Sequence, residues 1–388
     1  MTESRTTKPG FAPFLVLGHL VNDTSANLLS GLLPALASVY GLSYLLAGVL
    51  AMVFNITSSI LQPFVGRWFD RTQATWLLGV GVGVNCLAMS LAGIAPDYTV
   101  LLFLVGIAGL GSAAFHPPGF SAVVKSTSSS RGRAVGVFLS GGNTGFFLGP
   151  LVAGLMVSAL GLPGTLLLLP IGVATAVFLL RIGLDHRETA VSVTAPAQPA
   201  NKGLISLLVG ITAFRSIAIQ SAVTFLPLYF VAKGEPLVVA TGIASLWLGV
   251  GVLGQLAGGY LSDRVGRRPV IVASLLAGGV AFYGFLTATG FISVLLLALS
   301  GALLYASWSV IVVMSSEAAP ANVGAVTGLM LGFSVGVGGF GALGFGGAAD
   351  TLGLTLAFTL VIAFAWAGGA LALLLPRRVE SSQLGASH

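Results

Sequence analysis

Hydrophobic runs of membrane-crossing length follow one another along the whole chain. They lack the strict alternation of apolar and polar residues that marks a membrane β-strand, and each can cross a bilayer as a helix, which takes roughly 20 apolar residues. The pattern therefore predicts an all-α membrane protein with twelve transmembrane helices. The predicted spans are residues 12–40, 43–65, 74–95, 98–124, 132–160, 163–184, 203–232, 237–262, 269–290, 292–318, 322–350 and 353–376.

The longest polar stretch, residues 185–202, is rich in Pro, Ala and Thr and is typical of a flexible linker. The six spans on one side of it match the six on the other side at a constant offset. Pro34 corresponds to Pro227, and several polar residues match at the same offset. Parallel repeats of this kind occur in transporters that hold a substrate near the bilayer midplane. We therefore expect two pseudo-symmetric six-helix bundles, residues 1–184 and 203–388, joined by a cytoplasmic linker over 185–202.

Composition and charge placement agree with this topology. Hydrophobic residues make up 56% of the chain and charged residues 7%, whereas soluble domains carry about 25% charge, so a soluble globule is excluded. All but two of the 17 Lys and Arg residues fall on one side of the predicted spans; Lys233 lies on the other side and Arg215 lies within a span. Because basic residues concentrate in cytoplasmic loops, we predict an inner (plasma) membrane protein with both termini cytoplasmic.

The sequence offers few residues for enzymatic, redox or metal chemistry. Cys86 is the single cysteine and the four histidines are scattered along the chain, which argues against a disulfide within the chain and a zinc cluster. We recognise neither a phosphate loop nor a nucleophile with a matching base. We therefore expect no enzymatic activity, no cofactor and no metal, and no nucleic-acid partner. The expected partners of a monomeric chain are the lipid bilayer, protons and a small-molecule substrate.

A charged turn follows the eighth span, where residues 259–269 read GYLSDRVGRRP, and the first half has the shorter GRWFDRTQ at 66–73. Gly permits close helix approach, Asp can face a helix N-terminus, and Arg binds carboxylates. We expect these contacts to close the cytoplasmic mouth; anchoring by positive charge alone is the alternative. The predicted gating residues are Gly66, Asp70, Arg71, Gly259, Asp263, Arg264, Arg267, Arg268 and Glu317.

Small residues in the fifth span predict close helix packing. Gly145 and Gly149 are four positions apart, which places two small residues on one helix face, where another helix can approach closely. Pro150 follows directly and removes a backbone donor, so we expect it to bend the helix.

Ionisable residues inside the spans are candidates for function, because burial in lipid is unfavourable for them. His19 and Asp23 share one helix face at i, i+4 spacing, and the helical rise puts Asp23, His116 and Arg215 at similar depths. We predict that Asp23, His116 or His19 carries a proton and that Arg215 binds substrate. The alternatives are a permanent Asp23–Arg215 pair that fastens the halves and, for His19, a packing role. The other predicted substrate contacts are Asn22, Asn27, Phe115, Gln220 and Asn143.

Several of these segments resemble one known family. The turn at 259–269 looks like the signature loop GxxxDRxGRR of the major facilitator superfamily, and GFFLGPLVAG at 145–154 resembles a motif of its antiporters. HLVND at 19–23 and FHPPG at 115–119 resemble the fosmidomycin-resistance branch. The resemblance implies the major facilitator fold and proton-driven efflux of small molecules, with a phosphonate antibiotic as the substrate that gives the branch its name.

The chain departs from that branch at one position. Family members often carry an acid after the FHP triplet, whereas this chain has Pro118, so the implied proton role falls to His116 and Asp23. We therefore predict a secondary transporter that works by alternating access and exports a small, anionic or drug-like molecule in exchange for protons. Two alternatives stay open: a proton symporter that takes up a sugar or organic acid, and a non-transporting membrane receptor or assembly protein.

Overall fold

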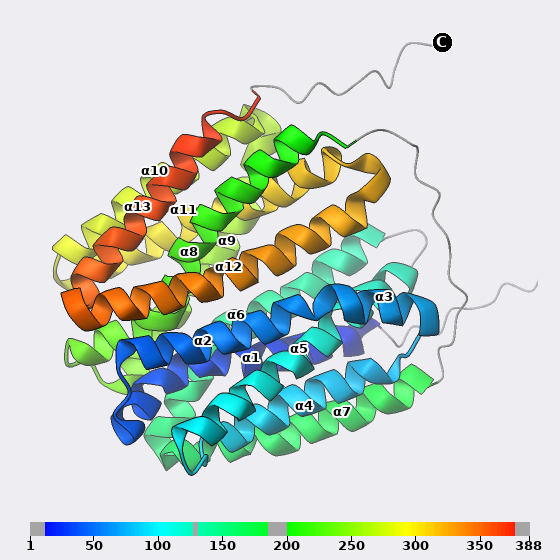
Figure 1. Cartoon of the computed structure of the whole chain (residues 1–388), viewed down its shortest axis with the longest axis vertical. Coiled ribbons are helices and arrows are strands. Elements are labelled where there is room, and N and C mark those ends of the chain that lie inside the picture. Colours follow the sequence, from blue (N-terminus) through cyan, green and yellow to red (C-terminus); the bar gives the residue numbers. More distant parts are fainter. Residues whose placement is uncertain (1–11, 127–130, 185–199, 377–388) are drawn as a thin grey trace, which may run out of the picture. The chain divides into compact units, whose positions relative to one another are not determined.

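The computed structural model describes residues 12–126, 131–184 and 200–376, which form long helices joined by short turns (Figure 1). No β-strand occurs within these ranges. Two short 3-10 segments accompany the α-helices, η1 at Leu162–Leu167 and η2 at Pro320–Asn322. The α-helices are α1 Ala12–Tyr40, α2 Tyr44–Ile60, α3 Gln62–Thr72, α4 Trp76–Ala92, α5 Tyr98–Ser126, α6 Arg131–Leu160, α7 Leu168–Leu184, α8 Lys202–Ala232, α9 Leu237–Val265, α10 Arg267–Thr287, α11 Gly290–Glu317, α12 Val323–Leu352 and α13 Leu354–Ala372.

The predicted all-α structure is confirmed for the described residues. The physical reason is that a helix satisfies the backbone hydrogen-bonding groups of an apolar segment within itself, which lipid cannot do. Ten segments among these residues are long and apolar enough to cross a membrane. α1, with Asn22 and Asp23 in its middle, and α4, with 17 residues, fall outside that count. The second predicted span is divided at Leu61 into α2 and α3, with Pro63 in the first turn of α3.

The first of two compact units comprises Met1–Thr194, Gln220–Gly249 and Leu331–Phe358, and is called unit 1 below. In its described part, α1 packs along α6, and α4 packs between α5 and α7. Gly145 and Gly149 lie on the face of α6 that meets α1, since a Cβ on Gly149 would come within 2.6 Å of Asn27 Cβ. The absence of side chains at these two positions lets the α1 and α6 backbones approach each other closely.

Unit 1 also contains segments from the second half of the sequence. Leu151 N in α6 donates a hydrogen bond to Ser245 Oγ in α9 at 3.0 Å. The stacked rings of Phe225 and Phe345, with centroids 4.4 Å apart, join α8 to α12. The compact contacts of unit 1 are therefore made by helices from both predicted repeats.

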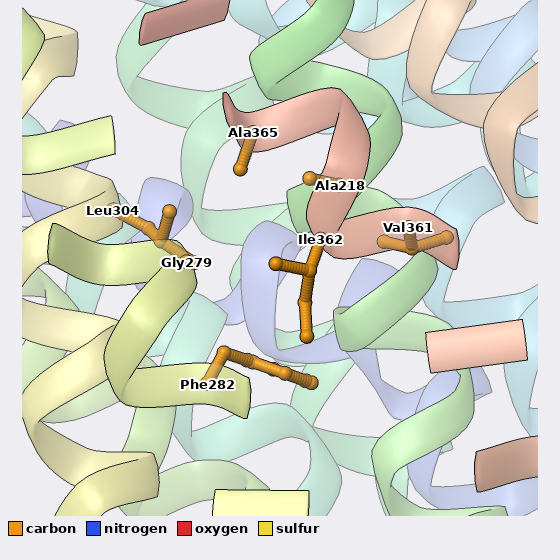
Figure 2. A pocket seen from close by; sticks show the side chains of 7 residues that line it. All are labelled: Ala218, Gly279, Phe282, Leu304, Val361, Ile362 and Ala365. Carbon is orange, nitrogen blue, oxygen red and sulfur yellow. The ribbon is translucent and has the colours of Figure 1, made fainter. Parts of the chain in front are cut away.

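Unit 2 comprises Ala195–Ile219, Val250–Met330 and Thr359–His388. In its described part α10 packs along α11. A cavity of about 10 Å³ with an apolar lining lies among α8, α10, α11 and α13 (Figure 2). This volume is at the lower limit for one water molecule, so the cavity is too small for a substrate. The residues that line it are Ala218, Gly279, Phe282, Leu304, Val361, Ile362 and Ala365.

Candidate functional site

Three titratable side chains meet inside unit 1, and we call them the Asp23 triad: His19, Asp23 and His116. His19 Nε2 lies 3.3 Å from Asp23 Oδ2, and His116 Nε2 lies 3.1 Å from Asp23 Oδ1. α1 supplies His19 and Asp23 one turn apart, and α5 supplies His116. The two imidazole rings meet edge to face with centroids 5.3 Å apart. Each oxygen of the carboxylate therefore faces its own imidazole nitrogen.

Backbone carbonyls fix the tautomers of both histidines. The Nδ1 atom of His19 lies 2.9 Å from Phe138 O, and the Nδ1 atom of His116 lies 2.9 Å from Ser112 O. A carbonyl oxygen can only accept, so each Nδ1 carries a hydrogen and donates it. In the neutral form of either ring, Nε2 would then be without a hydrogen.

This arrangement sets the number of protons that the triad can hold. An unprotonated Nε2 and a carboxylate oxygen are both acceptors, so each of the two Nε2–oxygen contacts requires a proton between its atoms. The Asp23 carboxyl group can carry one of these two protons at most. With both contacts formed, at least one of His19 and His116 is therefore an imidazolium.

The three side chains differ in their access to solvent. The exposed fraction is 6% for the His19 side chain, 15% for Asp23 and 29% for His116. His116 is therefore the member of the triad that solvent reaches most readily.

Buried amides position Asp23 from the neighbouring helices. Asn22 Nδ2 donates to Asp23 Oδ1 at 3.0 Å, and Asn85 Nδ2 donates to Asn22 O at 2.9 Å and Asn22 Oδ1 at 3.0 Å. Ser25 Oγ in turn donates to Asn85 Oδ1 at 3.3 Å. Asn22 and Asn85 are fully buried, so Asn22 positions Asp23 through its hydrogen bond, and its predicted contact with substrate stays a prediction.

Asn85 was missed by the sequence analysis. The available signal was an amide side chain in the middle of the otherwise apolar helix α4, because polar side chains within membrane helices usually bond to a neighbouring helix.

The triad also corrects the expectation that the scattered histidines form no cluster. One ligand atom from each of His19, Asp23 and His116 lies within 4.8 Å of the others, so among the described residues these three could hold a metal ion. Sequence separation hides this proximity, which arises because α5 packs beside α1. The triad atoms already pair with one another, and we assign no metal to the cluster.

Arg215 forms a separate polar centre inside unit 2. The residue is 4% exposed, and its Nε donates to Ser307 Oγ at 3.1 Å. The guanidinium carbon lies 4.8 Å from the ring centroid of Trp308 and 5.6 Å from that of Tyr305. Within the described part of unit 2, no carboxylate lies at ion-pair distance from Arg215. The aromatic faces offset part of the unfavourable burial of this cation. The positive charge of the guanidinium suits the binding of an anion.

The structure places the other predicted substrate contacts as follows. Asn27 Nδ2 donates to the backbone oxygen of Asp23 at 3.2 Å. Phe115 is fully buried beside the His19 ring, with centroids 5.8 Å apart. Asn143 in α6 and Gln220 in α8 are partly exposed. Substrate contact by these four residues stays a prediction.

Two predicted gating residues form an ion pair inside unit 2. The two terminal nitrogens of the Arg267 guanidinium, Nη1 and Nη2, face the two carboxylate oxygens of Glu317, and this pair joins the start of α10 to the end of α11. Gly266 precedes this pair with φ of 93°, a backbone conformation that Gly adopts without strain. Because of this turn, α10 can begin immediately after α9 ends.

The other predicted gating residues lie near the same helix ends. The Arg264 guanidinium stacks on the Tyr260 ring with its carbon 4.4 Å from the centroid, and Gly259 faces Ser309. The side chain of Asp70 lies outside the described residues. Asp263 and Arg71 are exposed, and Gly66 and Arg268 are partly exposed. Their gating roles stay predictions.

Comparison with known proteins gives a family model and full-length relatives. The model described as Major Facilitator Superfamily matches residues 15–259. The chain is 30% identical to the uncharacterized MFS-type transporter YfnC of Bacillus subtilis strain 168, over 97% of this chain and 96% of the relative. It is 29% identical to the fosmidomycin resistance protein of Escherichia coli strain K12, over 97% of this chain and 94% of the relative.

A solved structure shares the fold. The crystal structure of a bacterial homolog of the human lysosomal transporter Spinster, inward-facing and occupied, superposes with a TM-score of 0.82 at 16% identity. The match covers 94% of this chain and 95% of that chain.

Proposed function

Because this chain belongs to the major facilitator superfamily, whose members are multi-pass membrane transporters, we propose that it exports a small, anionic or drug-like molecule in exchange for protons. The superfamily and its fold, both predicted from sequence motifs, are confirmed by the family model and the solved relative. The relative that confers fosmidomycin resistance supports efflux as the direction. The observation that carries proton exchange is the Asp23 triad, with its two proton-requiring contacts.

Proton release from the triad changes the forces between α1 and α5. Without a proton, His116 Nε2 would present a lone pair to Asp23 Oδ1, which lies 3.1 Å away, and two acceptors at this distance repel each other. The contact between α5 and α1 then opens, whereas proton uptake closes it. Exposure of the triad first to one side of the membrane and then to the other would couple this change to alternating access.

The substrate site that we propose is built around Arg215. A buried guanidinium flanked by Trp308 and Tyr305 can bind a carboxylate or phosphonate through charge-assisted hydrogen bonds, while the rings contact apolar parts of the molecule. The aromatic residues and Ser307 were not among the predicted contacts. Two aromatic residues within the four-residue segment 305–308 were the signal in the sequence.

The placement of basic residues supports an inner-membrane location with both termini on the cytoplasmic side. Under this orientation the connection between α1 and α2 and the one between α12 and α13 face outward. We propose that the chain works as a monomer, with protons, the substrate and the bilayer as its partners.

Flux measurements in proteoliposomes test the proposed function. A thermal-shift screen of phosphonates, organic acids, sugars and lipophilic drugs, with fosmidomycin included, first identifies the compound that most stabilises the purified protein. A gradient of that compound is then imposed on vesicles that contain a pH-sensitive dye. Antiport predicts proton flux opposite to the compound, whereas symport predicts flux in the same direction and a receptor predicts neither flux.

The variant Asp23→Asn separates coupling from binding. We expect it to abolish transport driven by a pH gradient while substrate exchange across the membrane continues, because a neutral amide cannot pair with the imidazolium whose proton the triad exchanges. Asp97→Asn is the matched control, since Asp97 accepts from Val100 N at 2.9 Å within its own helix start. If transport driven by pH survived both Asp23→Asn and His116→Ala, proton coupling through the triad would be wrong.

A further inference from the structure

The first turn of α2 is capped by a residue from near the other end of the sequence. Tyr44 N donates to Asp350 Oδ1 at 2.7 Å, and Leu45 N donates to Asp350 Oδ2 at 2.9 Å. Leu46 N donates to Ser43 Oγ at 3.3 Å. A helix start leaves these N–H groups without partners inside the helix, and Asp350 of α12 satisfies two of them. We call these two hydrogen bonds the Asp350 cap.

The Asp350 cap holds by charge as well as by hydrogen bonding. A carboxylate at a helix N-terminus faces the positive end of the helix dipole, and both of its oxygens take part here. The contact is exposed to solvent, so water can replace either partner when the two helices separate. The cap is therefore suited to form and break repeatedly.

Next to the cap, α2 and α12 are in direct backbone contact. A Cβ on Gly48 of α2 would lie 2.7 Å from Ala342 O of α12, and a Cβ on Gly346 of α12 would overlap Tyr44 O of α2. Real Cβ atoms essentially never approach other atoms within 3.0 Å, so any larger residue at either position would push the helices apart. The cap and the glycines together form one continuous contact between α2 and α12, which Figure 1 shows side by side.

This contact joins the two predicted repeats at one end of the helices. α2 belongs to the first repeat and α12 to the second, and the contact lies inside unit 1. It lies next to the turn before Tyr44 and the turn after Leu352. The placement of basic residues assigns both turns to the outer side. A transporter built from two rocking repeats must open and close a contact of this kind in each cycle.

We propose that the Asp350 cap is the latch of an outer gate: the Asp350 carboxylate holds the N-terminus of α2 against α12 while the outer side is closed. Release of the cap lets the two helices part and exposes the transport path outward. The inference requires transport by two repeats and does not depend on proton coupling or on the identity of the substrate. Failure of the Asp23 experiments would leave it intact.

Spin-label distance measurements test the latch on the full chain. Cys86 is the only cysteine and is 1% exposed, so a Cys86→Ser background accepts two new labels. Val39 at the end of α1 and Leu352 at the end of α12 are 65% and 48% exposed, and cysteines there carry the labels. We expect Asp350→Asn and Asp350→Ala to increase the population of long distances severalfold, whereas Asp350→Glu, which keeps the charge, stays closer to the parent.

Asp97→Asn is the control, because Asp97 caps its own helix α5 and touches neither α2 nor α12 through that bond. Thermal stability measured alongside separates gate opening from misfolding. If Asp350→Ala proves unstable, Asp350→Asn still tests the proposal, because the Asn side chain has the same shape as the parent side chain. Distance distributions that are identical for Asp350→Asn and the parent would overturn the proposal. An equal shift in Asp97→Asn would overturn it as well, because the effect would not be specific to the cap.

The glycines provide an independent test of the same contact. Gly48→Ala and Gly346→Ala should each shift the label pair to longer distances, because their Cβ atoms meet backbone atoms of the other helix. Gly344→Ala on the same helix is the matched control, since a Cβ there meets nothing within 4 Å. A shift as large in Gly344→Ala as in Gly346→Ala would show that α12 responds to any substitution and would overturn the gate assignment.

Discussion

Asn85 on α4 donates its side-chain amide to two oxygens of Asn22 on α1, the backbone oxygen at 2.9 Å and the side-chain oxygen at 3.0 Å. Both residues are fully buried. The second bond orients the Asn22 amide so that its nitrogen faces Asp23 Oδ1 at 3.0 Å. The position of the Asp23 carboxylate therefore depends on a helix that contributes no residue to the triad.

We expect Asn85→Leu to lower both stability and proton coupling. The substitution removes the donor to the Asn22 side-chain oxygen and the acceptor of the Ser25 hydroxyl, and an unsatisfied buried polar group costs about 1–3 kcal/mol. Asp23 then loses its fixed orientation, so the pH profile of transport shifts in addition to the fall in melting temperature. Ser90→Ala is the control, since Ser90 Oγ donates to Cys86 O within its own helix α4. An unchanged pH profile would assign Asn85 a structural role alone.

A substitution at Gly142 on α6 provides a steric test of the triad. A Cβ there would overlap the His19 ring, and His19 cannot retreat freely because Phe138 O holds its Nδ1. We expect Gly142→Ala to break the His19–Asp23 contact and to reduce transport driven by a pH gradient by about tenfold, equal to about 1.4 kcal/mol. Gly136→Ala on the same helix, where a Cβ meets nothing within 4 Å, should transport like the parent.

Arg215→Gln should weaken the binding of anionic compounds selectively. Loss of one charge-assisted interaction of about 1.5–3 kcal/mol corresponds to a Kd about tenfold to about hundredfold higher. Arg215→Lys should recover part of the affinity, because it keeps the charge without the planar guanidinium. Binding is measured by calorimetry on an anionic hit of the thermal-shift screen and on a neutral analogue. Equal losses for both compounds would show that Arg215 shapes the site without binding the anion.

Charge reversal tests the role of the ion pair between Arg267 and Glu317. The two side chains are 24% and 40% exposed, so we expect each single substitution, Arg267→Glu or Glu317→Arg, to lower the free energy of unfolding by at most about 1 kcal/mol. The double reversal should recover most of this loss together with the transport rate. Arg268→Glu, one position further along the chain, provides the comparison. If the double variant were no better than the singles, the pair would have no role in transport.

The membrane architecture could be predicted from the sequence, because the bilayer requires long apolar helices and leaves a strong hydrophobic pattern. The pairing of His19 with Asp23 was also predictable, since helix geometry alone places residues four apart on one face. The addition of His116 was not, because it depends on how α5 packs against α1. Asn85 and Trp308 were missed for the same reason: each acts on a residue of another helix, and a single sequence contains no record of that proximity.

The acceptor for His19 Nδ1 is the backbone oxygen of Phe138, 2.9 Å away. Any residue type at position 138 supplies the same oxygen, so this hydrogen bond itself does not depend on the Phe138 side chain, whose ring stacks on the imidazole with centroids 4.2 Å apart. Sliding of α6 along α1 can change it, because it moves the oxygen itself. The tautomer of His19 in the triad thus depends on where the α6 backbone lies and would respond directly to a displacement of that helix.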